Sequence, residues 1–303
     1  MSASPTGSGA LLATAVFGLA VGVAPAYADT VYLNSSPDFV PQVQHSVAGA
    51  RYRLDGTNWD MALHSGTGTN DAEPAPADFV QAELGSLTTL NNAAFRFTVD
   101  HLAGTGFTYT MTDLSTNAGS TLSWGAGLPG TNVGTLQRWT GAGLDGIDHA
   151  PTDPFNFLLI EARAQRNNVA IPAEPDSSIT FSNLVFSSED LSTSGSLVPG
   201  STDENTPGSV WTPPGIGSEA GRYWQFLYSD VDLSRHDWTF SADVSGSATT
   251  NSGQELLRFE LTAQNVTPVP LPAGVWLLLS GLTGLAGLGA GSRRRRGRDD
   301  CRV

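Results

Sequence analysis

Lysine is absent from this 303-residue chain, and cysteine is nearly so. All 15 basic residues are arginines, and the single cysteine, Cys301, is the third residue from the C-terminus. Schiff-base, pyridoxal-phosphate and P-loop chemistry need a lysine, whereas disulfides, zinc–thiolate sites and thiol nucleophiles need cysteine. These absences exclude all of those chemistries from the body of the protein.

Charged residues are scarce, at 15% of the sequence, against roughly 25% in ordinary soluble proteins. Residues 29–267 carry nine arginines and 27 acidic residues, a net charge of −18. A surface this acidic repels phosphate backbones and anionic lipid headgroups. We therefore expect no nucleic-acid partner for this segment, while cations and neutral sugars remain as partner classes.

A sustained helical period is missing between the two ends of the chain, where apolar and polar residues alternate in short runs separated by Gly, Asn, Asp, Ser and Pro. This pattern is typical of antiparallel strands with one buried face. Strands are expected at residues 52–54, 59–63, 79–84, 95–100, 107–111, 155–160, 179–186, 223–228, 238–244 and 257–261. The sequence therefore predicts an all-β fold, a two-sheet antiparallel β-sandwich of the jelly-roll type.

The β-sandwich ectodomain is expected to occupy residues 29–264 as one domain, with a candidate internal division near residues 171–178. One run in it, residues 155–160, is apolar on both faces at its end. A strand with this pattern is covered on both sides, so we expect it at the centre of a sheet.

Residues 1–28 have the pattern of a secretory signal peptide. An apolar stretch at residues 10–24 precedes the small residues Ala26 and Ala28, which predicts cleavage by signal peptidase before Asp29. The start of the chain has no basic side chain, a departure from the usual pattern. An uncleaved N-terminal anchor is the alternative.

Near the other end, residues 273–291 predict a transmembrane helix. The 18 uncharged residues from Ala273 to Ala290 would span roughly 27 Å as a helix, which is enough to cross the hydrocarbon core of a membrane. Arginines 293–296 follow directly. By the positive-inside rule, residues 292–303 then form a cytoplasmic tail and the ectodomain lies outside.

This order of a short proline motif, an apolar helix and an arginine cluster resembles the PEP-CTERM sorting signal that exosortases recognise, in its VPLPA variant. The residues that carry the resemblance are Val269, Pro270, Leu271, Pro272, Ala273, Arg293, Arg294, Arg295 and Arg296. Leu271 stands where the commoner form has glutamate, and the tail is longer than is usual in that family. Residues 265–272 are expected to form a proline-containing linker that includes the motif.

The resemblance implies a protein of a Gram-negative envelope. Such a protein crosses the inner membrane, is held there briefly by its C-terminal helix, is cut near the proline motif by an exosortase-type enzyme, and reaches the cell surface or an exopolysaccharide matrix. A permanent tail anchor is the alternative. The ectodomain is similar in general character to choice-of-anchor domains, β-rich modules joined to such signals, and no residue roles follow from that similarity.

Catalytic motifs are absent from the sequence, including the serine-nucleophile elbow and the zinc-protease helix. The five histidines stand singly, at His45, His64, His101, His149 and His236. We therefore expect a non-catalytic protein of the surface or matrix. A secreted hydrolase remains a less favoured alternative, because a triad is recognised by its geometry and not by its order in the chain.

Two groups of aspartates are candidates for calcium, which binds six to eight oxygens. The first group is Asp145, Asp148 and Asp153, in a loop rich in glycine and proline. The second is Asp230, Asp232 and Asp237, near a strand end. Turn aspartates that bind their own backbone are the alternative in both cases. No other cofactor is expected.

The tryptophans bear on a second functional hypothesis, a carbohydrate-binding module. Trp59, Trp224 and Trp238 lie on alternating strands and are expected to fill the core. Trp211 lies in the proline-rich segment 207–215, which has no strand pattern. It is a candidate platform on which a sugar ring stacks, with packing onto its own loop as the alternative.

Overall fold

The computed structural model describes residues 29–34, 40–55, 58–65, 79–133, 150–164, 177–212, 215–248 and 257–269. Within these ranges the chain forms seventeen strands, the short helix α1 (Leu87–Leu90) and the 3-10 helix η2 (Leu233–Arg235). The predicted all-β class is confirmed. The expected signal peptide, membrane helix and cytoplasmic tail lie outside the described residues.

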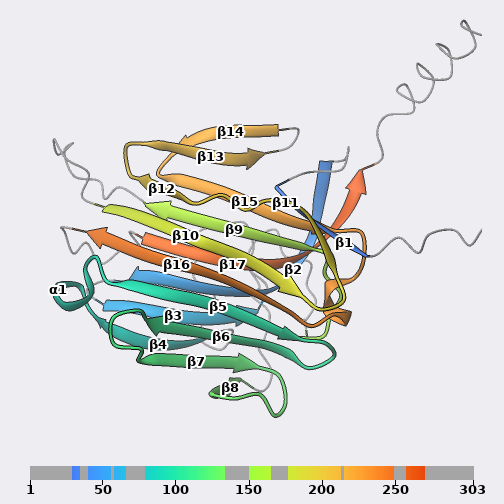
Figure 1. Ribbon diagram of the computed structural model, residues 1–303, viewed down its shortest axis with the longest axis horizontal. Helices are drawn as coiled ribbons and strands as arrows, with labels where there is room; N and C mark the ends of the chain where they lie inside the picture. Colours follow the sequence, from blue (N-terminus) through green and yellow to red (C-terminus); the bar gives the residue numbers. More distant parts are fainter. Residues whose placement is uncertain are drawn as a thin grey trace, which may run out of the picture.

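Sheet A, the larger sheet, has ten strands. In chain order they are β1 (Thr30–Leu33), β2 (Val40–Asp55), β3 (Asn58–Ser65), β4 (Phe79–Ser86), β9 (Phe157–Ala164), β11 (Ser192–Gly195), β13 (Pro207–Thr212), β14 (Gly215–Ala220), β15 (Arg222–Ser229) and β17 (Leu257–Val269). Their spatial order is β11-β1-β15-β9-β17-β2-β3-β4, and the β13–β14 hairpin joins the sheet through β15 (Figure 1).

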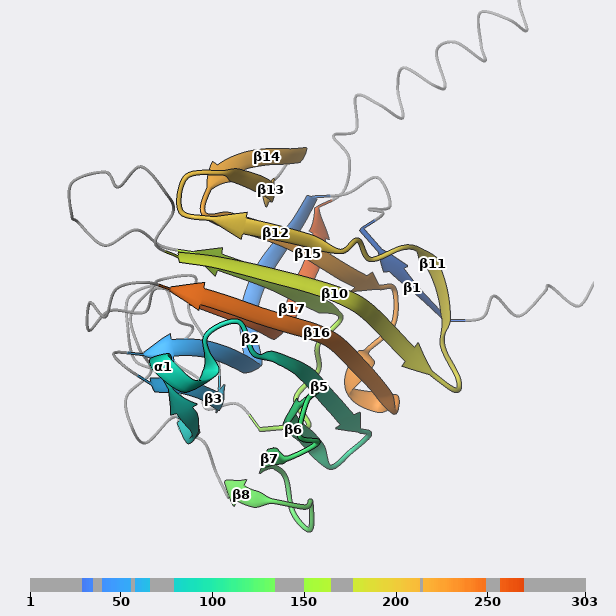
Figure 2. The ribbon, with the colours of Figure 1, turned by 60° about the vertical axis from the view of Figure 1, so that its left-hand side comes forward.

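Sheet B has seven strands. They are β5 (Ala94–Leu102), β6 (Gly106–Asp113), β7 (Gly119–Trp124), β8 (Thr131–Val133), β10 (Ser177–Ser188), β12 (Gly200–Asp203) and β16 (Trp238–Ala248). Their spatial order is β12-β10-β16-β5-β6-β7-β8. Figure 2 shows β10, β16 and β5 side by side across this layer.

Strand pairing is antiparallel throughout the described sheets except for β1 with β11 and β7 with β8, which are parallel. Each strand expected from the sequence is present, and β9 is central because β15 and β17 flank it. Strands from before and after residues 171–178 pair with one another in both sheets, as β5 does with β16 and β9 with β17. The chain is therefore interleaved across that segment, as in a single domain.

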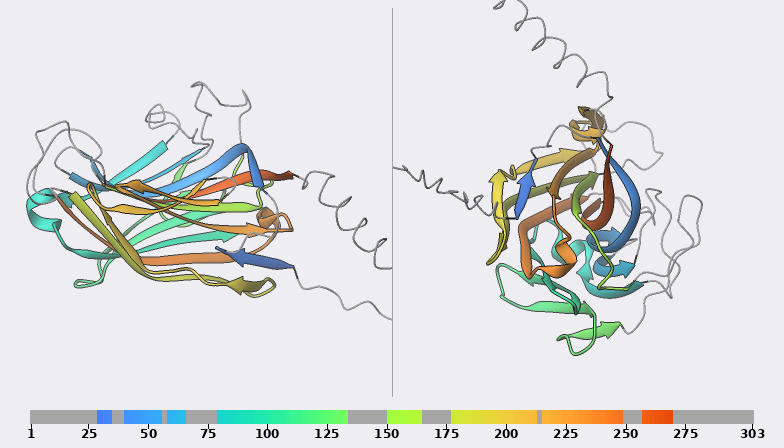
Figure 3. Two further views of the ribbon diagram at one scale, coloured as in Figure 1. Left: turned by 90° about the horizontal axis from the view of Figure 1, so that it is seen from above. Right: turned by 90° about the vertical axis from the view of Figure 1, so that its right-hand side faces the viewer.

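The core lies between the sheets and is rich in aromatic rings. Phe97 of sheet B meets Phe259 of sheet A edge-on at 5.2 Å between ring centroids. On the sheet-A side, the Trp59 ring stacks on Tyr52 at 5.2 Å. Trp59 has no exposed surface, and a side chain at Gly246 would come within 2.7 Å of its ring. The glycine therefore makes room for the indole, whose burial is one of the larger apolar contributions to stability. Figure 3 shows the two layers from above and end on.

Two of the three tryptophans expected in the core are there, since Trp59 and Trp238 are buried between the sheets. The prediction for Trp224 was wrong. On β15, Leu227 faces the core whereas Phe226 belongs to a separate apolar cluster with Phe157. Strand alternation places Trp224 on the side of Phe226, and the indole is half-buried on the outer face of sheet A.

The outer face of sheet A carries a layer of buried and partly buried charged side chains, which we call the arginine layer. Its members are Arg51, Arg53, Asp60, His64, Glu161, Arg163, Arg258 and Glu260, from β2, β3, β9 and β17. Arg53 and Asp60 are about 1% exposed, and their side chains pair at 2.9 Å. We expected the polar face of β17 to lie in solvent, and that expectation was wrong because Glu260 is only 4% exposed.

Strand β17 extends beyond the expected end of the ectodomain. Residues 265–269, expected as linker, pair with the first residues of β2, where Val269 lies opposite Val40. At the other boundary, β1 starts at Thr30, one residue after the expected signal-peptide cleavage. Paired strands therefore occupy both boundaries of the described body.

Candidate functional site

A depression of about 800 Å³ lies at one end of the outer face of sheet B, and we call it the sheet-B depression. Its lining comes from β5 and the turn after it, β6, the end of β10 and the residues after it, the last residue of η2, and the start of β16 with the residue before it. Asp100, Leu102, Thr108, Ser187, Asp237 and Thr239 are among the lining residues. These side chains come from segments far apart in the sequence, and pairing of the strands brings them together.

The alternation of β5 and β16 decides which side chains reach the depression. Trp238 is paired with His101, and the next pair is Thr239 with Asp100. Trp238 and His101 are buried, and their rings stack at 5.3 Å. Asp100 and Thr239 point to the opposite face, where the Thr239 hydroxyl donates to Asp100 Oδ1 at 2.6 Å. This bond holds the Asp100 carboxylate in place.

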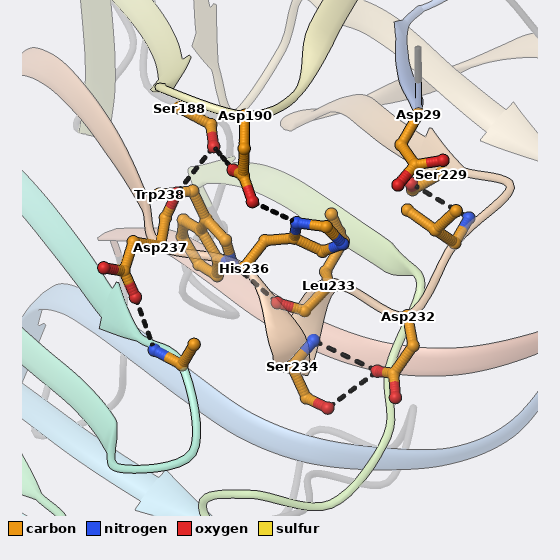
Figure 4. A network of polar contacts seen from close by, with 12 residues as sticks. Asp29, Ser188, Asp190, Ser229, Asp232, Leu233, Ser234, His236, Asp237 and Trp238 are labelled. Carbon is orange, nitrogen blue, oxygen red and sulfur yellow. Dashed lines mark hydrogen bonds and ion pairs between the residues drawn. The ribbon is translucent and has the colours of Figure 1, made fainter. Parts of the chain in front are cut away.

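A chain of polar contacts borders the depression where β10 ends (Figure 4). The Ser188 hydroxyl donates at 2.7 Å to Asp190 Oδ1, and Asp190 Oδ2 lies 2.6 Å from His236 Nδ1. The hydrogen bonds from His236 and then Ser188 hold the pKa of Asp190 below its usual value. Asp190 is therefore ionised at neutral pH, and the contact ties the residues after β10 to those before β16.

The 3-10 helix η2 is positioned by Asp232 at its N-terminus. Asp232 Oδ1 accepts from the backbone and hydroxyl of Ser234 at 3.1 and 2.7 Å, as an N-cap residue does. Just after η2, Asp237 Oδ1 accepts from the backbone N–H of Ala103 at 2.7 Å. These bonds attach the β5–β6 turn and the η2 segment to one another (Figure 4).

Beneath the depression, His101 is held as a neutral ring. Its Nδ1 donates to the backbone carbonyl of His236 at 2.9 Å, and its Nε2 is buried without a hydrogen-bond partner among the described residues. Burial lowers the pKa of His101, and this outweighs the raising effects of the His236 carbonyl and Asp237. His101 therefore stabilises the end of the sandwich and carries no charge at neutral pH.

The polar side chains at the border of the sheet-B depression are mainly hydrogen-bond acceptors. Among them, Ser188 is not placed as the nucleophile of a catalytic triad. In a catalytic triad the serine hydroxyl bonds to the imidazole, whereas Ser188 donates to the carboxylate of Asp190. The depression is thus lined mainly by carboxylates and hydroxyls, with one arginine, Arg235, and an exposed aliphatic side chain, Leu102, at 45% exposure. Such a surface suits a ligand with several hydrogen-bond donors.

The candidate calcium residues are not assembled within the described residues. Asp145 and Asp148 lie outside them, and Asp153 accepts from the backbone N–H of Ala150 at 3.0 Å, as in a turn. In the second group each carboxylate has its own backbone partner, since Asp230 accepts from Thr30 and the other two bind Ser234 and Ala103 as above. The described part of the chain holds no group of three acidic, histidine or cysteine side chains that could bind a metal ion.

Trp211 lies in a strand, and its assignment to a loop was wrong. It belongs to β13, where it is paired with Ile216 of β14. The hairpin lies beyond β12 and β15, at the edge of the fold in Figures 1 and 2. The proline-rich composition concealed the strand. A proline is tolerated as the first residue of a strand, where its lack of an N–H does not interrupt the hydrogen bonds of the sheet, and Pro207 is the first residue of β13.

The sequence did not predict the depression as a site, although Asp237 was a candidate calcium ligand and His101 was one of the histidines considered. Asp190 and His236 are 46 positions apart, and no local pattern marks either of them. Among the described residues there is no helix of the length and hydropathy needed to cross a membrane, and the expected sorting signal beyond Val269 lies outside them. No family model, no curated protein and no solved structure matches this chain.

Proposed function

We propose that this chain is a non-catalytic protein of a bacterial surface or exopolysaccharide matrix, secreted by a signal peptide and processed through a PEP-CTERM signal by an exosortase-type enzyme. The observation that supports the proposal is the place where the last described strand ends. Strand β17 ends at Val269, the first residue of the proline motif, and the rest of the motif follows it in the sequence. A cut near the motif would therefore release the β-sandwich without dividing it.

Polysaccharide binding by the β-sandwich is the second part of the proposal. The sheet-B depression supports it, because carboxylates held by Thr239 and Ala103 keep fixed acceptor positions. Recognition of sugars depends on such preplaced polar groups beside an apolar contact. A hydrolase is less well supported, because the Ser188 hydroxyl is bonded to a carboxylate and not to a base.

Processing of the tail tests the first part. We expect native protein to begin at Asp29 and to lack the apolar segment and Cys301 when its intact mass is measured. Deletion of residues 293–296 should impair this processing, since the arginines fix the orientation of the helix. As a matched control, Arg298→Gln with Arg302→Gln should leave processing unchanged, because those arginines lie outside the cluster. Full-length C-terminal peptides from mature surface protein, in a host that encodes an exosortase, would contradict the proposal and indicate a permanent anchor.

Calcium binding by the Asp145–Asp153 loop remains part of the proposal. Several carboxylates brought together repel one another until an ion binds, so calcium should raise the melting temperature at millimolar concentration. Asp148→Ala should abolish the rise, whereas Asp203→Ala should not, because the Asp203 carboxylate at the end of β12 binds Asn205 and Thr206. An unchanged melting temperature in the parent protein would show these to be ordinary turn aspartates.

A further inference from the structure

We propose that the ligand of the sheet-B depression is a cationic amino sugar, a pyranose unit with a free ammonium group, within a polysaccharide. This inference rests on the proposed function, in which the partner is a polysaccharide. It goes further by assigning the site and the charge of the ligand. Three features of the depression lead to it: its charge, its free acceptor atoms and its neutral lining.

The charge of the lining is negative after its ion pairs are counted. Four carboxylates line the depression, those of Asp100, Glu189, Asp190 and Asp237. Asp190 is paired with His236 at 2.6 Å. Arg235 is the one arginine of the lining; its guanidinium is 80% exposed and is paired with Asp232, which is not a lining residue. Four carboxylates against one arginine leave the lining acidic, and Asp100, Glu189 and Asp237 have no ion pair among the described residues. A neutral sugar leaves this charge unbalanced, whereas an ammonium group balances part of it.

Two of those carboxylates are held in fixed positions with an acceptor atom to spare. Asp100 Oδ1 is bound by the Thr239 hydroxyl and Asp237 Oδ1 by the Ala103 N–H, and the Oδ2 atom of each has no protein partner among the described residues. Asp100 is opposite Thr239 on the paired strands β5 and β16, and Asp237 directly precedes β16. The two carboxylates therefore line the same depression from neighbouring segments, where they can accept from different donor groups of one ligand.

The neutral part of the lining fits the rest of such a ring. Thr108 and Ser187 supply hydroxyls, and Leu102 supplies an exposed aliphatic surface against which C–H groups can pack. A metal ion is a poorer fit, because no metal-binding group is formed by the described residues. A lysine peptide also carries ammonium groups, but its side chains have no hydroxyls to form hydrogen bonds with the hydroxyls of Thr108 and Ser187.

The test measures binding of four probes to the purified protein by titration calorimetry at low and moderate salt. The probes are a glucosamine tetramer, its N-acetylated neutral counterpart, a tetramer of galacturonate and tetralysine. We expect the glucosamine tetramer to bind more tightly than the neutral and the anionic tetramers. Its affinity should fall as salt rises, because the pairs formed are partly exposed to solvent.

Variants locate the binding. Asp100→Asn and Asp237→Asn keep the side-chain shape and the bonded oxygen, and each should weaken the glucosamine tetramer about two- to fivefold. The matched control is Asp113→Asn, which removes the same charge at a turn where Asp113 binds Ser115 and Thr116, outside the lining. This control should leave the affinity unchanged.

Each other outcome overturns the inference in a recognisable way. Equal affinity for the neutral and glucosamine tetramers would refute the charge assignment and leave polysaccharide binding intact. Equal binding of tetralysine, with the same dependence on Asp100 and Asp237, would identify the ligand as a basic peptide. If neither sugar tetramer binds, both the inference and the polysaccharide-binding part of the proposed function fail.

Discussion

Replacing Asp60 by alanine should lower the free energy of unfolding by about 3–5 kcal/mol, because it removes the carboxylate that is paired with a buried guanidinium. Asp60 and Arg53 pair at 2.9 Å with side chains only 1–2% exposed. Gln81 joins them, donating to Asp60 at 2.6 Å and accepting from Arg53 at 3.1 Å. In the Asp60→Ala variant the guanidinium of Arg53 would remain buried but would no longer be paired with this carboxylate. Urea unfolding of the purified protein measures the change.

Two control variants test whether the loss of stability in Asp60→Ala comes from breaking the ion pair and from its burial. The double variant Arg53→Met with Asp60→Leu removes both charges and should recover most of the lost stability, as replacing a buried ion pair by apolar side chains often does. Asp243→Ala breaks a pair whose arginine, Arg96, is half exposed, and it should cost about 1 kcal/mol or less. A similar cost for Asp60→Ala would show that solvent reaches the arginine layer.

The strands of this fold are predictable because alternation reports directly on the two faces of a strand. Phe95, Phe97 and Val99 are buried in β5 as the period-two pattern requires. Alternation does not tell whether the second face is covered as well. The alternation at residues 257–261 therefore predicts that Arg258 and Glu260 lie on a solvent-exposed face of the strand. In the structure these two residues of β17 belong to the arginine layer.

The candidate site is less predictable, since it depends on contacts across the chain. Asp100 faces Thr239 only because β5 pairs with β16, and the register of that pair is set by the whole hydrophobic pattern of both strands. Asp237 looked like a calcium ligand from its neighbours in sequence, but its carboxylate binds the turn after β5. The sequence predicts that the protein is acidic, but it does not predict which carboxylates come together at the sheet-B depression.

Acid should destabilise the protein well above the pH at which ordinary carboxylates titrate, because two buried histidines resist protonation. His64 has no exposed surface, and its Nε2 lies 3.1 Å from Glu260. Burial lowers the pKa of His64, and Arg51 and Arg258 add to the lowering against the opposing effect of Glu260. Gly49 makes this packing possible, since a side chain there would clash with the imidazole of His64.

The direction of the pH effect follows from the two states. In the unfolded chain a histidine has a pKa of about 6.5, so below that pH the unfolded state binds protons that folded His64 and His101 do not. Stability is full above about pH 6.5 and is lost as the pH falls, by up to about 1.4 kcal/mol per pH unit for each histidine. For Glu260, burial raises the pKa, but Arg258, His64 and Arg51 outweigh it and hold the pKa well below its usual value. Its contribution is therefore lost only at lower pH.

Urea unfolding at pH 7.5, 6.0 and 5.0 measures this loss before most carboxylates titrate. His64→Gln and His101→Asn each keep an amide nitrogen near the bonded ring nitrogen, Nε2 and Nδ1 respectively, and cannot gain a proton. The double variant should therefore show a much flatter dependence of stability on pH than the parent protein. His236→Gln is the control, because His236 is only partly buried, with 15% of its side chain exposed, and lies beside the exposed Asp190. A parent protein equally stable at pH 7.5 and 5.0 would mean that folded His64 and His101 accept protons as readily as the unfolded chain does.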